Sequence, residues 1–212
     1  MPDGAHHVAF AYSADGKDRF TTVYPNLNLI DGTRDFSGDW TNIARWIDDG
    51  TYKGLTVKKR TAPWDGIYKT FTVPKAGTFT IPKDGKYTFS AYVKSSGSEA
   101  NVFRYVLVNG GDRESSRKAF DNNFDWSRDS VTFDLKENDK VSVRYEITGS
   151  GSDSALWTAG HKWEDGSIAT PWMPSFSEVT PEDYPSYIGT YTDNNSNEQS
   201  TDPARYSWKK IE

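Results

Sequence analysis

Residues 141–147 read Val-Ser-Val-Arg-Tyr-Glu-Ile, and they give the clearest indication of the fold class. Apolar and polar side chains alternate along it without a break, which places them on opposite faces of an extended strand. Similar alternation runs through residues 67–73, 87–94 and 130–135. Short apolar runs at 54–59, 102–108 and 155–163 are separated from these by turns rich in Gly, Asp and Asn. Regularly spaced short strands predict an all-β sandwich or barrel, and no window has a convincing helical period.

The domain organisation follows from where this pattern of short strands begins and ends. We expect residues 26–176 to form a jelly-roll β-sandwich. Residues 1–25 and 177–212 are polar and turn-rich, with aromatic residues in two strand-like runs each. A lone hairpin is only marginally stable in water, so we expect the two ends to pair into one small β element with the sandwich inserted between them. The alternative is two independent tails, because chain termini are often loose.

Charge and composition exclude several classes of protein. The net charge is −5 and no long basic cluster is present, which argues against a nucleic-acid partner. Cysteine is absent, so disulfides and thiolate metal sites are excluded. No apolar stretch reaches the roughly 18 residues of a membrane span, and the N-terminus lacks the pattern of a secretory signal. We therefore expect a protein made in a cytoplasm, with neither membrane nor nucleic acid as its partner.

Catalytic motifs are missing. The sequence contains no nucleophile elbow, phosphate-binding loop, dinucleotide fingerprint or HExxH zinc motif. Among three histidines only His161 is a plausible general base, and nothing in the spacing of 30 carboxylates singles out a glycosidase pair. We predict that the chain is not an enzyme.

No metal or cofactor is predicted. The adjacent His6 and His7 fall on opposite faces of one strand, which separates them. Asp31, Glu164 and Asp165 could hold a calcium ion with backbone carbonyls, but carboxylates in turns are usually only solvated.

A binding site is better supported, because the chain holds eight Trp, 12 Tyr and 11 Phe. Sugars present apolar faces ringed with hydroxyls, so their sites combine aromatic platforms with polar groups such as Arg and Asp. Trp64 and Trp126 lie in turn-like segments, where a large aromatic is poorly explained by the core. Each is interpreted as a platform or, alternatively, as packing at the edge of the core.

Further candidates lie on the strands. Tyr92, Arg104 and Arg144 are placed opposite the apolar sets of their strands, where they would form the floor of a site or an ordinary solvated face. Trp157 and His161 share one side of the last strand and could point either way. The candidate saccharide-binding residues are therefore Trp64, Tyr92, Arg104, Trp126, Arg144, Trp157 and His161.

Three phrases carry a resemblance to a known family. Residues 162–174, Lys-Trp-Glu-Asp-Gly-Ser-Ile-Ala-Thr-Pro-Trp-Met-Pro, resemble the closing phrase of jelly-roll carbohydrate-binding modules in tail proteins of phages that infect Gram-positive bacteria. Trp163 stands where those modules have leucine, which suggests a core position. Residues 7–16, and residues 187–193 with 200–208, are similar to phrases that often follow each other closely in such tail proteins.

The resemblance implies a function as well as a fold. It points to a tail or baseplate component of a lactococcal- or streptococcal-type phage, located in the virion. Such a module would bind host cell-wall polysaccharide without cleaving it and would assist adsorption beside other phage tail proteins. The alternatives are an adaptor that docks other tail proteins without binding sugar, and a glycan-degrading enzyme. The family shares no set of ligand residues that transfers to this chain.

Overall fold

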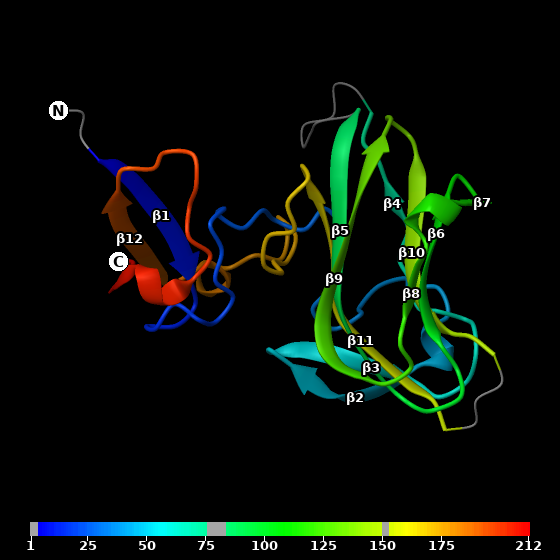
Figure 1. Cartoon of the computed structure of the whole chain (residues 1–212). Coiled ribbons are helices and arrows are strands. Elements are labelled where there is room, and N and C mark those ends of the chain that lie inside the picture. The colour runs from blue at the N-terminus through cyan, green and yellow to red at the C-terminus, as the bar shows by residue number, and fades with distance from the viewer. Residues whose placement is uncertain (1–3, 76–83, 150–152) are drawn as a thin grey trace. The chain divides into compact units, whose positions relative to one another are not determined.

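The computed structural model describes residues 4–75, 84–149 and 153–212. They form two compact units (Figure 1). Residues 28–169 make up the first, here called the sandwich unit. The described residues up to Leu27, together with Thr170–Glu212, make up the second, here called the terminal unit. Residues 170–176, assigned to the sandwich by sequence, thus group with the terminal unit.

The described residues of the sandwich unit form two sheets whose strands pair antiparallel. The β11 sheet has the order β2 (Ile47–Tyr52), β3 (Leu55–Arg60), β11 (Ala155–Asp165), β5 (Gly85–Ser96), β9 (Phe124–Leu135). The β10 sheet has the order β4 (Phe71–Thr72), β10 (Lys140–Ile147), β6 (Val102–Val108), β7 (Gly111–Asp112), with β8 (Lys118–Phe120) also paired to β6. Two short 3₁₀ turns, η1 (Ile43–Arg45) and η2 (Glu114–Ser116), lie in its loops. The predicted all-β sandwich is confirmed.

The inner faces of the two sheets form the core. The alternation in β10 is confirmed, because Val141, Val143, Tyr145 and Ile147 are all at most 2% exposed. Trp163 of β11 is 1% exposed and stacks on Phe71 at a ring distance of 4.8 Å, which agrees with its expected core position. Burying one such aromatic side chain removes on the order of 150–250 Å² of apolar surface from water.

The segment at 67–73 departs from its predicted strand. Only Phe71–Thr72 pairs with β10. The residues before it run along β10 as a loop, in which the Trp64 N–H donates to the Ile147 carbonyl at 2.9 Å. Gly66 is required there, because a Cβ on it would lie 2.7 Å from the Tyr145 carbonyl oxygen. Packing of this loop along β10 therefore determines the conformation of most of residues 67–73, although their alternation predicts a strand.

Strand β2 was not predicted at all. Its residues are exposed or half-exposed throughout, so they lack the alternation that marks a half-buried strand. It forms because Lys53 and Gly54, both with positive φ, make a tight hairpin turn to β3.

The terminal unit is a three-stranded sheet of order β1 (Ala5–Ala11), β12 (Tyr187–Asp193), β13 (Ser207–Lys210), with 3₁₀ turns η3 (Pro181–Asp183) and η4 (Pro203–Arg205). β1 and β12 pair from Ala5 opposite Asp193 to Ala11 opposite Tyr187. The prediction that the two chain ends pair into one β element is confirmed. Trp208 packs on two glycines, since a Cβ at Gly16 or Gly189 would lie within 3 Å of its ring.

The two N-terminal histidines have separate partners. His7 stacks on Tyr191 at 4.5 Å, and its Nε2 lies 2.8 Å from Asp193 Oδ1. His6 Nδ1 lies 3.2 Å from the Thr192 hydroxyl. In the described part of the chain, no three His, Cys, Asp or Glu side chains gather as they would around a metal ion. Over the same residues, no helix has the length and apolar character needed to cross a membrane.

Candidate functional site

The seven candidate residues do not form one surface. Trp64 and Arg144 lie on the outer face of the β10 sheet. Tyr92, Trp126 and Trp157 lie on the outer face of the β11 sheet. Arg104 and His161 lie between the two sheets.

His161 belongs to the core. It is 2% exposed and meets four aromatic rings edge-on: Phe36, Trp40, Phe89 and Tyr145. Burial lowers the pKa of His161 from 6.5 to about 3, so its ring stays neutral. Its Nε2 lies 2.9 Å from the Thr158 hydroxyl. The expectation that His161 contacts a saccharide is corrected, because the side chain does not reach the surface.

Arg104 also points inward. Its Nη1 donates to both oxygens of Asp129 at 2.6 and 2.8 Å, and its Nε donates to the Ser116 carbonyl at 3.1 Å. The Tyr145 hydroxyl donates to the same carboxylate at 2.7 Å. Both faces of the stretch 102–108 carry apolar residues, so the sequence does not show which face points inward. Arg104 was expected on the outer face, but it shares the inward face with the fully buried Val102. Arg104 is thus a structural residue that joins the two sheets, not a surface contact.

The outer face of the β10 sheet carries an alternating row of rings and guanidinium groups. The Arg144 guanidinium lies 3.8 Å from the centre of the Tyr68 ring. Arg144 is directly opposite Tyr105 in the strand register, and the Arg117 guanidinium lies 5.2 Å from the Tyr105 ring. Phe103 continues the row along β6, with its ring 5.7 Å from Tyr105. We call this surface the Trp64 face: Trp64, Tyr68, Phe103, Tyr105, Arg117 and Arg144.

Trp64 stands at the rim of this face. Its side chain is 50% exposed, and its ring centre lies 6.4 Å from that of Tyr105. The turn that carries it has positive φ at both Trp64 and Asp65, which is unfavourable for non-glycine residues. Arg60, 9% exposed, holds this turn by donating from Nε to the Trp64 carbonyl at 2.7 Å and from Nη2 to the Pro63 carbonyl at 2.9 Å. The indole is therefore presented on a fixed backbone.

Polar groups on the Trp64 face are held in place as well. Arg144 Nη2 donates to the Ser142 hydroxyl at 2.8 Å, and Glu146 accepts the Gly66 N–H at 2.9 Å. Burial raises the pKa of the Tyr105 hydroxyl, with Arg117 acting in the opposite direction, so the hydroxyl stays protonated and can donate. A flat aromatic surface beside planar, multidentate donors is the combination that recognises a sugar ring with its hydroxyls.

The outer face of the β11 sheet is built differently. The rings of Tyr52 and Trp126 stack at 4.3 Å with an interplanar angle of 15°, and Tyr52 meets Tyr92 edge-on at 5.0 Å. Tyr52 and Trp126 belong to β2 and β9, the two edge strands, so the sheet curves until its edges meet across this face. Gly160, with φ +63°, permits the curvature, because a Cβ there would lie 2.8 Å from Leu55.

Trp157 lies on the same face and is surrounded by charge. Its Nε1 donates to Asp49 at 2.6 Å. The ammonium groups of Lys59 and Lys94 lie 5.2 and 4.9 Å from its ring centre. We call this surface the Trp126 face: Tyr52, Lys59, Tyr92, Lys94, Trp126 and Trp157. Tyr92 is only 7% exposed, so it supports the other rings from below.

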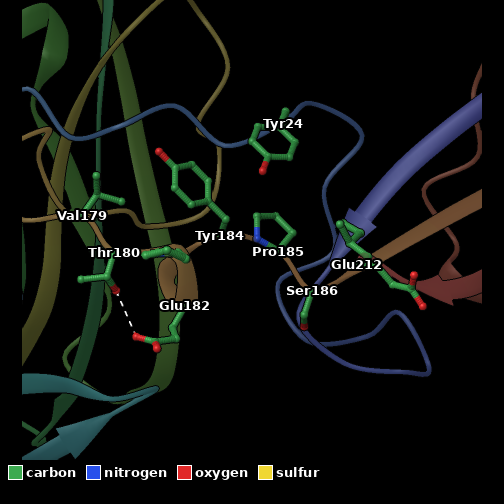
Figure 2. A pocket seen from close by; sticks show the side chains of 10 residues that line it. Tyr24, Val179, Thr180, Glu182, Tyr184, Pro185, Ser186 and Glu212 are labelled. Atoms are coloured by element: carbon green, nitrogen blue, oxygen red, sulfur yellow. Dashed lines mark hydrogen bonds between the residues drawn. The ribbon is translucent and has the colours of Figure 1, made fainter.

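The terminal unit has a groove of its own, with a volume of about 750 Å³. Figure 2 shows the rings of Tyr24 and Tyr184 next to Pro185, with Glu182 and Glu212 on opposite sides. The two tyrosine rings are 6.1 Å apart and nearly parallel, at 22°. Val179 and Ile211 also line the groove, as do the two carboxylates.

Comparison with solved structures gives a likeness over the whole chain. The chain is similar to a chain from the tripod (BppUct-A-L) of the baseplate of bacteriophage Tuc2009, with 26% sequence identity and a TM-score of 0.66. The match covers 100% of this chain and 80% of that one. The resemblance to phage baseplate proteins is confirmed.

Weaker likenesses reach carbohydrate-binding modules. TmCBM61 in complex with beta-1,4-galactotriose is 9% identical, with a TM-score of 0.47, over 66% of this chain and 100% of that one. The CBM22-1 xylan-binding domain from Paenibacillus barcinonensis Xyn10C is 14% identical, with a TM-score of 0.43, over 80% and 99%. Neither likeness carries a conclusion at these TM-scores. No family model matches the sequence, and neither does any curated protein.

Several site residues escaped the sequence reasoning. Phe103 and Tyr105 alternate with Val102 and Val106, so the register of β6 was the usable indication of an aromatic outer face. No pattern in the sequence indicates the role of Arg60. Its side chain donates to backbone carbonyls of a turn, and the conformation of that turn cannot be predicted from the alternation of apolar and polar residues.

Proposed function

We propose that the chain is a non-catalytic saccharide-binding module of a phage tail or baseplate, and that its Trp64 face binds host cell-wall polysaccharide and so assists adsorption. The observation that carries the proposal is Trp64: a half-exposed indole fixed by Arg60 beside a row of rings and guanidinium groups. The full-length similarity to a phage baseplate structure supports the setting in the virion.

Binding follows from the geometry of the face. The apolar side of a sugar ring stacks on Trp64 and Tyr105, which excludes water from both surfaces. The guanidinium groups of Arg144 and Arg117 then donate to hydroxyl oxygens, and Glu146 accepts from hydroxyl groups. An open site of this kind buries little area, so single contacts are weak, and many copies on one virion supply the avidity that holds a cell.

The proposal is tested with a fluorescent fusion of the full chain on a panel of Gram-positive strains with different wall polysaccharides. Trp64→Ala is expected to weaken labelling by about tenfold, the loss of one stacking contact. Phe176→Ala is the matched control, because Phe176 is 78% exposed and lies in the terminal unit. Equal labelling by wild type and Trp64→Ala would remove the site, and labelling of no strain would contradict the function. Release of reducing ends from purified wall polysaccharide would show cleavage instead of binding.

The groove of the terminal unit favours a second candidate function, docking to another tail protein. Tyr24 is 44% exposed and Ile211 is 38% exposed at this groove, and Glu182 and Glu212 flank it. An apolar segment with basic flanks would complement it. Tyr184→Ala is expected to abolish co-purification with other tail proteins of the same phage while leaving cell labelling unchanged; the opposite pattern would exclude the docking role.

A further inference from the structure

Two lysines on the Trp126 face converge on one ring. Lys59 of β3 and Lys94 of β5 lie on either side of β11, each directly opposite Trp157 in the strand register. Their ammonium groups lie 5.2 and 4.9 Å from the centre of the indole. Two ammonium groups therefore flank one aromatic ring, each within the distance of a cation–π contact.

Two acids of β2 lie in this region. Asp48 pairs with Lys58 at 2.6 Å, and Asp49 accepts the indole N–H of Trp157. Among residues 4–75, 84–149 and 153–212, neither Lys59 nor Lys94 has a carboxylate partner. Asp49 keeps its negative charge when it accepts from a neutral indole, but it forms no ion pair with either lysine. The ammonium groups of Lys59 and Lys94 are therefore free of carboxylate contacts within the described chain.

A stacked aromatic surface adjoins these cations. Lys94 lies where the pairing of β5 with β9 is irregular, between Val93 opposite Ser127 and Ser95 opposite Phe124. Trp126, on that irregular part of β9, stacks on Tyr52. The ligand that suits this face has a flat apolar side for the rings and a negative group for the lysines.

The Trp64 face lacks this character. Arg117 pairs there with Asp112, and Arg144 lies over Tyr68 and donates to Ser142. Its cations are thus compensated or engaged, which suits uncharged hydroxyl groups. The two faces lie on opposite outer sides of the sandwich, with two sheets and the core between them.

We propose that the Trp126 face is a second saccharide-binding site, back to back with the Trp64 face, and that it takes a sugar bearing a carboxylate or phosphate group. The sugar ring stacks on the Trp126 and Tyr52 pair, and the anionic group lies between Lys59 and Lys94. The inference rests on the proposed function in that both ligands are glycans, but it assigns a separate surface and a separate chemistry. One module then holds two glycan segments, or two parts of one.

Titration of the ¹⁵N-labelled full chain tests this, with the indole N–H resonances assigned through Trp→Phe variants. The probes are glucose, glucuronate, glucose 6-phosphate and inorganic phosphate. Glucuronate, glucose 6-phosphate or both should shift the Trp157 and Trp126 resonances saturably, with a Kd of about 1–10 mM, as expected for a ligand of this size. The stronger of the two identifies carboxylate or phosphate as the preferred group. Shifts should weaken at 0.5 M salt (roughly 4 Å screening length), because the contact is electrostatic.

Variants separate this site from the Trp64 face. Lys59→Met with Lys94→Met keeps the apolar stems and should weaken acidic-sugar binding about tenfold or more, through the loss of charge-assisted hydrogen bonds. Lys59→Arg with Lys94→Arg should retain it. Lys209→Met, on an exposed residue of the terminal unit, is the charge control. An unchanged Trp64 resonance in each variant verifies the fold.

Three results would overturn the inference: no shift at Trp157 with either acidic sugar, an equal shift with glucose, or an equal shift with inorganic phosphate alone. Trp64→Ala distinguishes the two proposals. It should leave the acidic-sugar shifts unchanged, whereas their loss would mean one site and not two. If those shifts persist but Trp64→Ala labels cells as well as wild type does, the second site stands and the proposed function of the Trp64 face fails.

Discussion

The two outer faces of the sandwich use similar side chains in different ways. On the Trp64 face, the key indole stands on a turn fixed by a buried arginine, and the guanidinium groups are engaged by rings, hydroxyls or carboxylates. On the Trp126 face, rings from the two edge strands stack on each other and two lysines remain unpaired. Curvature of one sheet and a loop packed along the other produce the difference. Composition alone would describe both as aromatic and basic.

The largest expected effect on stability comes from the Arg104–Asp129 ion pair, which joins the two sheets that carry these faces. Asp129→Ala leaves Arg104 buried without its carboxylate and should lower the free energy of unfolding by about 3–5 kcal/mol, as for other broken buried ion pairs. Both faces should lose binding together. Urea denaturation measures the stability change. Arg104→Met with Asp129→Leu, which removes both charges, should recover much of it; a loss below about 1 kcal/mol for Asp129→Ala would show that the pair does not hold the sheets.

The interior between the faces should also respond to pH. Because burial lowers the pKa of His161 to about 3, the unfolded chain binds a proton at this residue near pH 6.5 and the folded chain does not. Its contribution to stability is full above that pH and is lost as the pH falls toward 3. Between pH 6.5 and 4.5 the loss should be about 2.3 kcal/mol. In urea melts, His161→Gln should flatten this slope; the same slope in the variant would assign it to other groups.

A smaller effect should fall on the Trp64 face alone. Arg60→Met frees the carbonyls of Pro63 and Trp64 and lets the turn move, which should weaken binding at this face by about tenfold through lost preorganisation. Acidic-sugar binding at the Trp126 face should not change. Arg45→Met is the matched control, because Arg45 meets Asp65 of the same turn from a 62% exposed position. Equal effects of the two variants would mean that the buried clamp does not position Trp64.

The smallest effect should fall on the Trp126 face. Gly160→Ala places a Cβ against Leu55 and Tyr92 at a positive φ, and should cost about 1–2 kcal/mol and disturb the Trp126 indole resonance. Gly166→Ala also has a positive φ, but its Cβ meets nothing within 4 Å. The difference between the two variants in thermal unfolding therefore isolates the packing under Tyr92. No difference would show that the curvature does not depend on this contact.

The alternation of apolar and polar residues predicted the fold more completely than it predicted the candidate binding site. It placed the apolar side of β10 and Trp163 inside, and the aromatic runs at both ends predicted their pairing. It failed at Arg104, because β6 is apolar on both faces and its inward side holds a buried ion pair. It placed both Trp64 and Trp126 in turns, whereas Trp126 lies in strand β9, and it could not separate them because which sheet a residue joins depends on long-range pairing. The unpaired state of Lys59 and Lys94 is likewise a property of three-dimensional neighbours.

The pairing of β1 with β12 has a consequence for proteolysis. The chain enters the sandwich after Leu27 and leaves it before Thr170, so two covalent connections join the sandwich to the terminal unit. A protease that cuts either connection leaves the sandwich attached through the other. The fragment before the first cut then stays in place through the β1–β12 ladder, which spans Ala5 to Ala11. Shedding the module takes two cuts, whereas one cut suffices for a domain carried at the end of a chain.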